Sequence, residues 1–384
     1  MSRVVCHLRP SEFFGGPEKQ ILEHARRLVG SSWTPCVACF SKPGGVVELI
    51  ERASSEGIET FSVETLSNYS PYAIRHLRKA LAERSVDLLV CHGYRADLIG
   101  RVACAGTRIR KIAVVRGYTA EMLRVRLYEW IDRRVLTHFD RVVAVSEATR
   151  ASLCSSVLPA DKIDVVHNGV SIPERPPDPA PLAAEAGFDD SRPLLVAAGR
   201  LSPEKGHQHL IRAARLLADR GVDAGMAIVG EGREREQLER TIGDLDLGGS
   251  VKLFGHRRDP LACLAAADVV VNPSETEGSP NVVLEAMSIG RPIVATSVGG
   301  VPEILADDAN GVLVPPGSPA RLAEGIARVL ADSDLAQRLG RAARTTAIEG
   351  HSFDAMTERY EAIYDRVWSG ARGAVGAAYG GSAR

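Results

Sequence analysis

The sequence predicts an α/β protein with two domains in tandem, each built on a parallel β-sheet. Three observations predict this class. Short apolar runs alternate with segments of helical periodicity, a proline-rich segment interrupts that alternation near residue 172, and the alternation then resumes. A length of 384 residues with 45% hydrophobic content is enough for two domains with cores of their own.

The first half of the chain contains four expected strand–helix pairs. Each strand is a short apolar run, and each helix shows apolar positions three or four residues apart. The pairs are residues 4–8 with 18–29, 37–40 with 46–57, 87–91 with 95–105, and 142–145 with 147–157. Such pairs are typical of βαβ units, so we expect residues 1–172 to form an N-terminal Rossmann-like domain.

Five prolines between residues 173 and 181 predict a linker, because proline resists both helix and central strand. We place this linker at 173–192 and a C-terminal domain at 193–352. In that domain we expect strands at 194–198, 227–229, 251–254, 269–271 and 293–295, and helices at 207–220, 231–241 and 281–289. An amphipathic helix is expected at 353–368, and the Gly/Ala-rich residues 369–384 are expected to be disordered.

Overall composition gives no reason to expect nucleic-acid binding, because the net charge is −1 with 25% charged residues. The two halves differ: residues 1–172 hold 24 Lys and Arg against 18 Asp and Glu, and the rest hold 23 against 30. A basic N-terminal half could face an anionic partner, and uneven scatter of solvated charge explains the difference equally well. The sequence has no apolar run long enough to span a bilayer.

The seven cysteines are odd in number and mostly isolated, and no signal peptide precedes them, which favours the reducing cytoplasm. Cys36 and Cys39 have CxxC spacing within a strand-like run. Residues three apart in a strand point to opposite faces. We therefore interpret them as core thiols rather than as a redox or zinc site.

A basic segment at residues 101–134 combines arginines with aromatic and aliphatic side chains. Two interpretations stay equally open. The segment is a membrane-surface patch near an acceptor site, or it is a face that is simply solvated or that binds acceptor phosphate. Its cations are Arg101, Arg108, Arg110, Lys111, Arg116, Arg124, Arg126, Arg133 and Arg134, and Tyr128 and Trp130 lie among them.

The densest cluster of chemically useful residues follows the expected strand at 269–271. Glu277 lies in the loop, Pro280 suits a first helical turn that Ser279 can cap, and Glu285 lies one to two turns along the helix. Backbone N–H groups near residues 281–283 would then face the crevice at the strand ends, where anions bind in α/β sheets. Carboxylates such as these accept hydrogen bonds from sugar hydroxyls.

A second cluster follows the expected strand at 194–198. Arg200 and Lys205 put two cations beside the same crevice, where a guanidinium and an ammonium can bind a diphosphate. Gly299 and Gly300 follow the strand at 293–295 and would allow a close backbone approach.

Taken together, these residues resemble the donor site of the retaining GT-B glycosyltransferases of the family 4 type, the glycosyl transferases group 1. The resemblance rests on Glu277 and Glu285 eight positions apart, with Gly199-Arg200 and Lys205-Gly206 upstream and Gly299-Gly300 downstream. It extends over nearly the whole chain. The other matching motifs are Gly15-Gly16-Pro17-Glu18, Cys91-His92-Gly93, Val145-Ser146-Glu147 and His167-Asn168-Gly169-Val170.

The resemblance implies a GT-B fold. Two Rossmann-like domains would face each other across a cleft, the N-terminal domain would bind the acceptor, and the helix at 353–368 would cross back to that domain. The catalytic residues would be His92, Arg200, Lys205 and Glu277. Other donor-binding residues would be Gly15, Gly16, Gly255, His256, Gly278, Ser279, Asn281, Val282 and Glu285.

Each implied role has a chemical basis. Arg200 and Lys205 would neutralise the donor diphosphate, together with the Gly16 amide from the other domain. Glu285 would bind the ribose, and Glu277 would bind hydroxyls of the transferred sugar. The remaining implied contacts are His92 near the reacting carbon and the loop Phe254-Gly255-His256-Arg257 against the base.

The resemblance also implies the chemistry. A hexose or N-acetylhexosamine would pass, with retention, from a nucleotide-sugar, UDP favoured, to a hydroxyl of a glycan, a lipid-linked or a small-molecule acceptor. Neither a cofactor nor a metal is expected, since the cations and the helix N-terminus stabilise the departing diphosphate. The expected location is the cytoplasm, with peripheral contact at the inner membrane face.

Two other functions share these features, namely a GT-B-type sugar-nucleotide epimerase and a non-catalytic sugar-nucleotide binder. Structural explanations also remain for single motifs. Glu277 and Glu285 could be ordinary helix acids, Arg200 and Lys205 solvated loop charges, and His92 a structural histidine. Gly15-Gly16 could be a simple turn. A turn is the favoured interpretation of His167-Asn168-Gly169 and of Val229-Gly230-Glu231-Gly232, whose dinucleotide pattern lacks its third glycine.

Overall fold

The computed structural model describes residues 2–11, 13–42, 45–65, 70–117, 131–154, 158–189 and 191–370. The chain divides into two compact units, and each is described by itself. Unit 1 comprises Met1–Asn168 and the segment that begins at Phe353, and unit 2 comprises Gly169–Ser352. None of the helices in these described ranges is long and apolar enough to cross a membrane.

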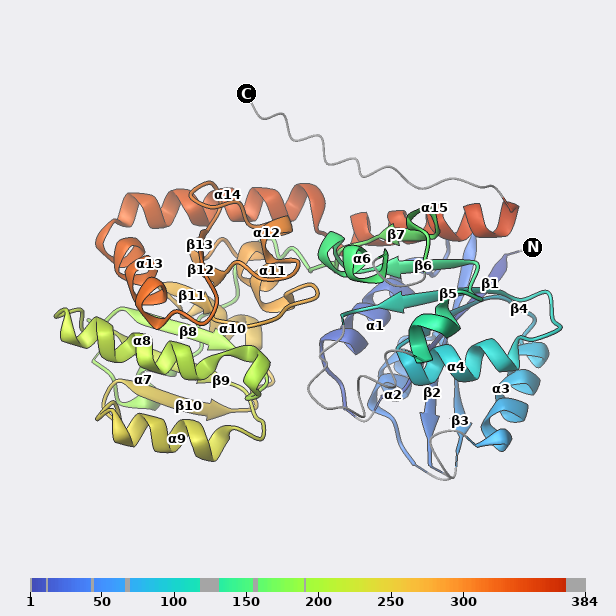
Figure 1. Ribbon diagram of the computed structural model, residues 1–384, viewed down its shortest axis with the longest axis horizontal. Helices are drawn as coiled ribbons and strands as arrows, with labels where there is room; N and C mark the ends of the chain where they lie inside the picture. The colour runs from blue at the N-terminus through green and yellow to red at the C-terminus, as the bar shows by residue number, and fades with distance from the viewer. Residues whose placement is uncertain are drawn as a thin grey trace. The chain divides into compact units, whose positions relative to one another are not determined.

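Unit 1 contains a seven-stranded parallel sheet with the strand order β3-β2-β1-β4-β5-β6-β7 (Figure 1). Its strands are β1 (Arg3–Arg9), β2 (Trp33–Ser41), β3 (Glu59–Glu64), β4 (Val86–His92), β5 (Arg110–Val115), β6 (Arg141–Ala144) and β7 (Ile163–Val165). Its helices are α1 (Gly16–Leu28), α2 (Glu48–Ser55), α3 (Pro71–Glu83), α4 (Tyr94–Ala103), α6 (Glu147–Cys154) and α15 (Phe353–Ser369).

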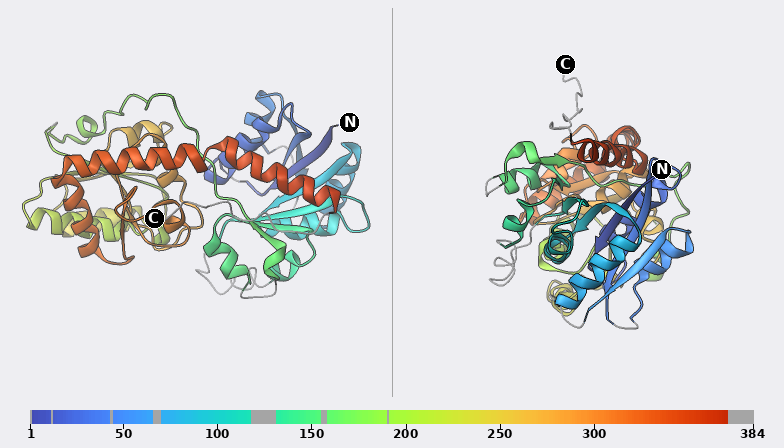
Figure 2. Two further views of the ribbon diagram at one scale, coloured as in Figure 1. Left: turned by 90° about the horizontal axis from the view of Figure 1, so that it is seen from above. Right: turned by 90° about the vertical axis from the view of Figure 1, so that its right-hand side faces the viewer.

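The last helix, α15, covers part of one face of the unit 1 sheet (Figure 2). Its apolar side packs on residues of β1, β4 and β5, which is why the helix belongs to unit 1 although unit 2 precedes it in the chain. Helices α3 and α4 cover the opposite face. The helix predicted at 353–368 is therefore present, and it includes Ser369, which we had assigned to the tail; residues 371–384 of that predicted tail lie outside the described residues.

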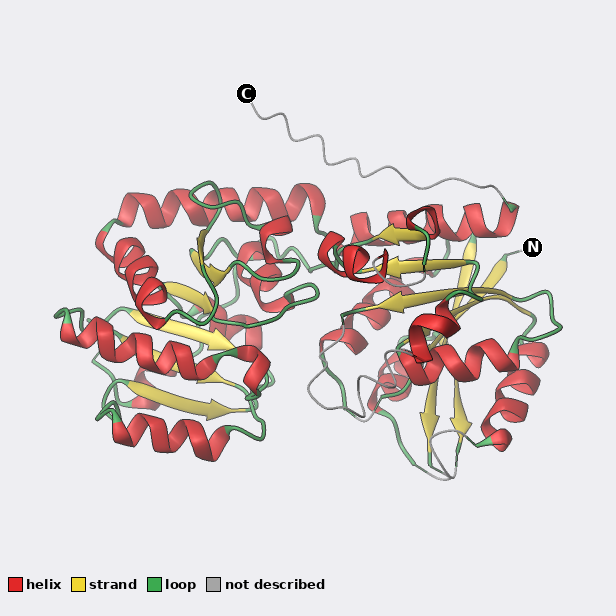
Figure 3. Cartoon of the chain, in the orientation of Figure 1, coloured by secondary structure: helices red, strands yellow, loops and turns green. Residues whose placement is uncertain are grey.

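Unit 2 contains a six-stranded parallel sheet with the strand order β10-β9-β8-β11-β12-β13, and helices lie on both faces (Figure 3). Its strands are β8 (Leu194–Ala198), β9 (Gly225–Val229), β10 (Val251–Gly255), β11 (Val269–Asn272), β12 (Ile293–Thr296) and β13 (Val312–Val314). Its helices are α7 (Leu182–Ala186), α8 (His207–Asp219), α9 (Arg235–Asp244), α10 (Pro260–Ala265), α11 (Asn281–Ser288), α12 (Val301–Ile304), α13 (Pro319–Ala331) and α14 (Ser333–Gly350).

The two parallel sheets confirm the predicted α/β class. The structure differs from the prediction in the segment that we expected to be a linker, residues 173–192. Leu182 begins α7, and Leu182 and Phe188 are buried in the core of unit 2. The run of prolines ends at Pro181. Burial of the apolar residues that follow it stabilises unit 2, and a solvated linker would not provide that stabilisation.

The CxxC pair consists of two core thiols on opposite faces of a strand, as its spacing predicts. Cys36 and Cys39 are both free and buried, on β2. Cys36 packs in the cluster under α3 and α4, whereas Cys39 packs in the cluster with α1 and α2 on the other face. Burial raises the pKa of Cys39 to about 12, which keeps this thiol protonated and unreactive.

Candidate active site

The strand order of unit 2 makes β8 the starting point of both halves of the sheet. The neighbours of β8 are β9 on one side and β11 on the other, so the direction of winding reverses between β8 and β11. In open α/β sheets, ligands bind outside the carboxyl ends of the strands at such a reversal. The loops that leave β8 and β11 carry Arg200, Lys205 and Glu277 to this point.

These two loops touch through their backbones. Gly206 has a φ of +64°, and an added Cβ would lie 2.1 Å from the carbonyl oxygen of Pro273. The Glu275 N–H donates to the Glu204 carbonyl at 2.8 Å. Glycine is required at 206 both for the left-handed backbone and for the close approach.

An ion pair joins the loops that leave β8 and β11. Lys205 Nζ lies 2.6 Å from Glu277 Oε1, and the Ser274 hydroxyl donates to the same oxygen at 2.7 Å. The Glu277 side chain is 8% exposed and the Lys205 side chain 25%. Glu277 Oε2 accepts no hydrogen bond from the described residues, so one oxygen of a well-fixed carboxylate remains available to a ligand.

A third loop, after β12, supports Glu277 from behind. Gly299 has a φ of +51°, and an added Cβ would lie 1.7 Å from the Glu277 carbonyl oxygen. The Gly300 N–H donates to that same oxygen at 3.3 Å. The predicted close backbone approach at Gly299-Gly300 is thus present, and it fixes the main chain that carries Glu277.

Arg200 occupies the same loop as Lys205 but is more exposed. Its side chain is 61% exposed and lies 3.3 Å from Glu204 Oε1, which also accepts from the Ser202 hydroxyl at 2.6 Å. The structure therefore brings Lys205 and Glu277 together. Arg200 lies on the same loop with an exposed side chain, which is long enough to reach a ligand.

His207 lies directly after this loop, as the first residue of α8, and our sequence analysis did not include it. Burial, followed by the charge of Lys205, lowers the pKa of His207 to about 4. The imidazole is therefore neutral at pH 7 beneath the Gly199-Arg200 turn. The only sequence signal was a histidine at a helix start next to Lys205-Gly206, which does not separate a buried from an exposed side chain.

Helix α11 begins at Asn281 with Pro280 in the capping position, which corrects our expectation that Ser279 caps it. Proline has no side-chain acceptor, so Pro280 itself gives no capping side-chain hydrogen bond. The bond from Leu284 N to Pro280 O at 3.1 Å is the first backbone bond of the helix, and the N–H groups of residues 281–283 precede it. Glu285 and the predicted donor contacts around the helix start are partly exposed: Gly278, Ser279, Asn281 and Val282.

Gly255 and His256 lie at the same edge of the sheet, at the end of β10 and two strands from β8. Gly255 has a φ of +73°, its carbonyl accepts from Gly230 N at 2.8 Å, and His256 is exposed. An added Cβ at Gly232 would lie 2.2 Å from the Leu201 carbonyl oxygen. This contact agrees with our interpretation of residues 229–232 as a tight turn.

Unit 1 has an equivalent reversal between β1 and β4, because β1 pairs with β2 on its other side. Gly15 and Gly16 follow β1 and begin α1, and His92 ends β4. Arg9 connects the two groups: its Nε donates to Glu18 Oε1 at 3.0 Å and its Nη1 to the His92 carbonyl at 3.3 Å. Glu18 in turn accepts from Gly15 N at 3.1 Å, which fixes the start of α1.

A buried polar cluster surrounds His92. His92 Nε2 lies 3.1 Å from His7 Nδ1, and His24 bonds Thr357 and Tyr364 of α15 at 3.0 and 2.9 Å. Burial lowers the pKa of all three histidines, that of His7 to about 3. The cluster lines a cavity of about 10 Å³ in unit 1, together with Gln20, Ile21, Arg116, Asn168, Met356 and Tyr360.

Our sequence analysis did not assign His7, His24 or Arg116 to the site. Arg116 Nη1 donates to Asn168 Oδ1 at 3.0 Å, and burial lowers the pKa of Arg116 to about 10. Arg116 belonged to the basic segment, but nothing in that segment distinguishes it from solvated arginines. Asn168 of the motif at 167–169 thus holds this arginine, a contact within unit 1.

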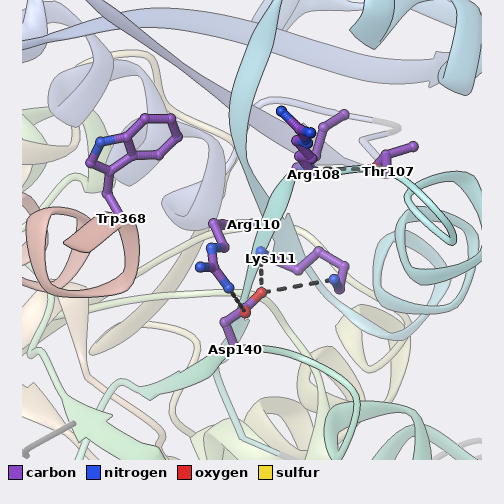
Figure 4. A pocket seen from close by; sticks show the side chains of 7 residues that line it. Thr107, Arg108, Arg110, Lys111, Asp140 and Trp368 are labelled. Atoms are coloured by element: carbon purple, nitrogen blue, oxygen red, sulfur yellow. Dashed lines mark hydrogen bonds and ion pairs between the residues drawn. The ribbon is translucent and has the colours of Figure 1, made fainter. Parts of the chain in front are cut away.

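A larger hollow of about 430 Å³ lies at the amino end of β5, the opposite edge of the sheet from His92 (Figure 4). Arg110 and Lys111 contact Asp140 there at 3.2 and 3.8 Å. Trp368 lies on another side of the hollow and is 44% exposed. The full lining is Thr107, Arg108, Ile109, Arg110, Lys111, Asp140 and Trp368. Arg124, Arg126, Tyr128 and Trp130 of the predicted basic segment lie outside the described residues.

Two family models match the chain. Residues 14–173 match the Glycosyltransferase Family 4 model, and residues 181–346 match the Glycosyl transferases group 1 model. An uncharacterized glycosyltransferase of Methanocaldococcus jannaschii is 32% identical over 342 residues, which cover 83% of this chain and 87% of the relative. A GDP-mannose-dependent alpha-(1-6)-phosphatidylinositol monomannoside mannosyltransferase of Mycolicibacterium smegmatis is 30% identical over 320 residues, covering 79% and 83%.

Among solved structures, the fold is shared with Anabaena Alr3699/HepE in complex with UDP and glucose. The TM-score is 0.83 at 20% identity, over 94% of this chain and 99% of that chain. The two parallel-sheet α/β units and this structural match confirm the predicted GT-B fold. The chain belongs to the glycosyl transferases group 1 family.

Proposed function

We propose that this glycosyltransferase moves a hexose or N-acetylhexosamine from a nucleotide-sugar to an acceptor hydroxyl with retention of anomeric configuration. The observation that carries the proposal is the Lys205–Glu277 pair at 2.6 Å, at the strand reversal of unit 2 and beside the start of α11. The pair combines a cation suited to phosphate with a carboxylate whose second oxygen can accept from sugar hydroxyls.

The donor diphosphate binds Lys205 and Arg200, and the first N–H groups of α11 add positive potential. Glu277 binds hydroxyls of the transferred sugar, and Glu285 binds the ribose. His92, Gly15 and Gly16 contribute from unit 1. The loop with Gly255 and His256 contacts the base, because it leaves the same edge of the sheet two strands away.

The chemical step follows from these charges. The bond between the sugar C1 and the phosphate oxygen breaks, and the electron pair stays on the departing diphosphate. The acceptor oxygen bonds to C1 on the same face, and its proton passes to the departing phosphate oxygen. Lys205, Arg200 and α11 stabilise the developing charge, so the reaction needs neither a metal nor a cofactor.

We favour UDP as the nucleotide of the donor. HepE, which shares the fold, was solved with UDP and glucose, whereas the mycobacterial relative is GDP-mannose-dependent. We therefore propose a thermal-shift panel of UDP, GDP, ADP and TDP sugars, since a bound ligand raises the unfolding temperature in proportion to occupancy. A UDP-sugar should give the largest shift, and a Lys205→Ala variant should lose it.

The product distinguishes transfer from the two other functions. Incubation of the preferred donor with and without acceptor glycans, followed by NMR of the anomeric proton, should give an α-linked product from an α-linked donor. Epimer formation from donor alone, faster than its hydrolysis, would show an epimerase instead. Binding without turnover, with Glu277→Ala matching wild type, would show a non-catalytic binder. Activity abolished by EDTA and restored by a divalent cation would contradict metal independence.

We also propose that the acceptor is a glycan, a lipid-linked or a small-molecule hydroxyl that binds unit 1, at the cytoplasmic face of the membrane. The hollow at β5 supports this location, because exposed Trp368 lies near Arg108, Arg110 and Lys111. More of the protein should sediment with phosphatidylglycerol vesicles than with phosphatidylcholine vesicles. The double variant Arg108→Gln, Arg110→Gln should bind the phosphatidylglycerol vesicles more weakly, whereas Arg75→Gln, which changes an exposed arginine elsewhere, should bind them as wild type does. Equal binding of both variants would contradict the membrane role of this hollow.

A further inference from the structure

The ring of His92 is held by a second histidine from the neighbouring strand. His7 on β1 pairs with Val90 on β4, so His7 and His92 project from the same face of the sheet. Their rings are stacked with centroids 5.4 Å apart and 27° between planes, and His7 Nδ1 lies 3.1 Å from His92 Nε2. Both residues are buried, with 1% and 3% exposed.

Both imidazoles are neutral near pH 7. Burial is the main cause, and the charge of Arg116 lowers the pKa of both rings further. Arg9 adds to the effect on His92. A neutral imidazole carries one proton, on either Nδ1 or Nε2, so one ring must donate in this hydrogen bond and the other must accept.

The choice at His7 therefore determines the tautomer of His92. If His7 Nδ1 carries its proton, His92 Nε2 accepts and His92 must carry its own proton on Nδ1. If His7 Nδ1 is bare, His92 carries its proton on Nε2 and presents a bare Nδ1. His92 Nδ1 and His7 Nε2 are buried and have no partner in the part of the chain that the structure describes.

Both arrangements leave one N–H and one bare nitrogen beside the cavity of about 10 Å³ that the two rings line. That volume admits about one water molecule. The hydrogen bond therefore couples the tautomers of the two rings, so a change at residue 7 changes which nitrogen of His92 carries the proton.

We propose that His7 is a positioning residue that holds the His92 ring and sets its tautomer. The bond leaves the other ring nitrogen of His92, Nδ1, with a single hydrogen-bonding role at the carboxyl end of β4. The inference rests on the proposed role of His92 in the transfer reaction, and it adds the residue that sets which His92 nitrogen can donate.

The test combines tautomer and kinetics in the full chain. In protein labelled with ¹⁵N-histidine, one ring nitrogen of His92 should give the shift of a protonated nitrogen and the other that of a bare one, with the signals assigned by loss in His92→Gln. His7→Leu should change this pattern and lower kcat on the order of 10- to 100-fold, as the loss of an orienting partner does. The KM for the donor should stay near that of wild type.

Two further variants separate positioning from packing. His7→Asn retains an N–H close to the position of Nδ1 and should restore most of kcat and the His92 tautomer. Trp33→Phe, the packing control, removes the bond from a buried side chain of β2 to Asp365 of α15 and no contact of His92, so it should lower stability and leave the His92 signals unchanged.

The outcomes are distinct. A His7→Leu protein with the His92 tautomer and kcat of wild type would overturn the positioning role, as would equal losses in His7→Leu and His7→Asn. Wild-type kcat in His92→Gln would overturn the role of His92 itself. Absence of transfer from every donor would count against the proposed function, while the tautomer measurement would still test the His7–His92 link.

Discussion

At the scale of single residues, the site in unit 2 depends on a carboxylate with one occupied and one available oxygen. Lys205 and Ser274 both bond Glu277 Oε1, and the backbone of Glu277 is fixed by Gly299 and Gly300. These contacts orient the side chain before any ligand arrives. Orientation of this kind reduces the entropy lost on binding and is a general source of catalytic power.

The first prediction concerns the charge of Glu277. Glu277→Gln keeps the shape and removes the charge, so kcat/KM should fall about 10- to 100-fold, the equivalent of about 1.5–3 kcal/mol for a charged hydrogen bond. Glu275→Gln is the matched control, since Glu275 lies on the same loop but bonds His209 at 2.7 Å. A larger loss in the control than in Glu277→Gln would contradict the assignment.

The second prediction concerns His207 and pH. Its folded pKa of about 4 lies below the ordinary value of 6.5, so the unfolded chain binds more protons between these values. Stability should therefore fall as the pH drops from about 6.5 to 4, and this one residue accounts for about 3 kcal/mol of the fall. Urea unfolding across this range should show the loss.

The control for the pH prediction is a pair of variants. His207→Gln cannot titrate, so its stability should depend less steeply on pH over this window. His256→Gln changes an exposed side chain and should follow wild type. Parallel curves for His207→Gln and wild type would show that His207 is not the titrating group.

At the scale of elements, helix α15 completes the core of unit 1. Its buried side chains pack against the same face of the sheet that carries His7. Trp33 Nε1 donates to Asp365 at 3.0 Å, and His24 bonds two residues of the helix. The buried residues of α15 are Phe353, Met356, Thr357, Tyr360, Ile363, Tyr364 and Val367.

The third prediction follows from that packing. A chain that ends at Ser352 should lose the fold of unit 1, because burial of each large apolar side chain contributes about 1.5–3 kcal/mol and a domain has only about 5–15 in total. A chain that ends at Gly370 keeps α15 and should match the full chain. Circular dichroism and limited proteolysis would compare the two, and equal protease resistance would refute the prediction.

Some elements with strong periodicity were predicted from sequence, whereas helices α3, α13 and α14 and the contacts between distant elements were not. The strand at 194–198 and the helix near 353–368 agree with the structure because apolar spacing alone defines them. Strand β13 was missed because three residues are too few to show alternation. The His7–His92 bond was missed because it requires β4 to pair with β1, which chain order does not reveal.

The candidate site shows the same division. Spacing predicted that Lys205 and Glu277 lie at strand ends, and their contact at 2.6 Å agrees with it. The capping residue of α11 and the neutral state of His207 depend on local backbone geometry and burial. Neither is encoded in a short motif.

At the scale of the whole molecule, the chain is two units with separate cores. Most of the proposed diphosphate contacts, Lys205, Arg200 and α11, belong to unit 2, and the Gly16 amide belongs to unit 1. The fourth prediction is that UDP, at about 100 times its Kd, stabilises unit 2 by about 2.7 kcal/mol and leaves the unfolding transition of unit 1 nearly unchanged. Calorimetry of the full chain, compared with a fragment of residues 169–352, would assign the transitions. A shift confined to unit 1 would move the diphosphate site to the other unit.

The discontinuity of unit 1 also sets an order for synthesis on the ribosome. Unit 2 is a continuous stretch, but the part of the unit 1 sheet that α15 covers stays exposed until this helix emerges after it. At about 5–20 residues per second, translation of unit 2 leaves that face exposed for roughly ten seconds or more. The half of the protein that is made first is therefore the half that finishes folding last, and it is the half that a chaperone would need to protect.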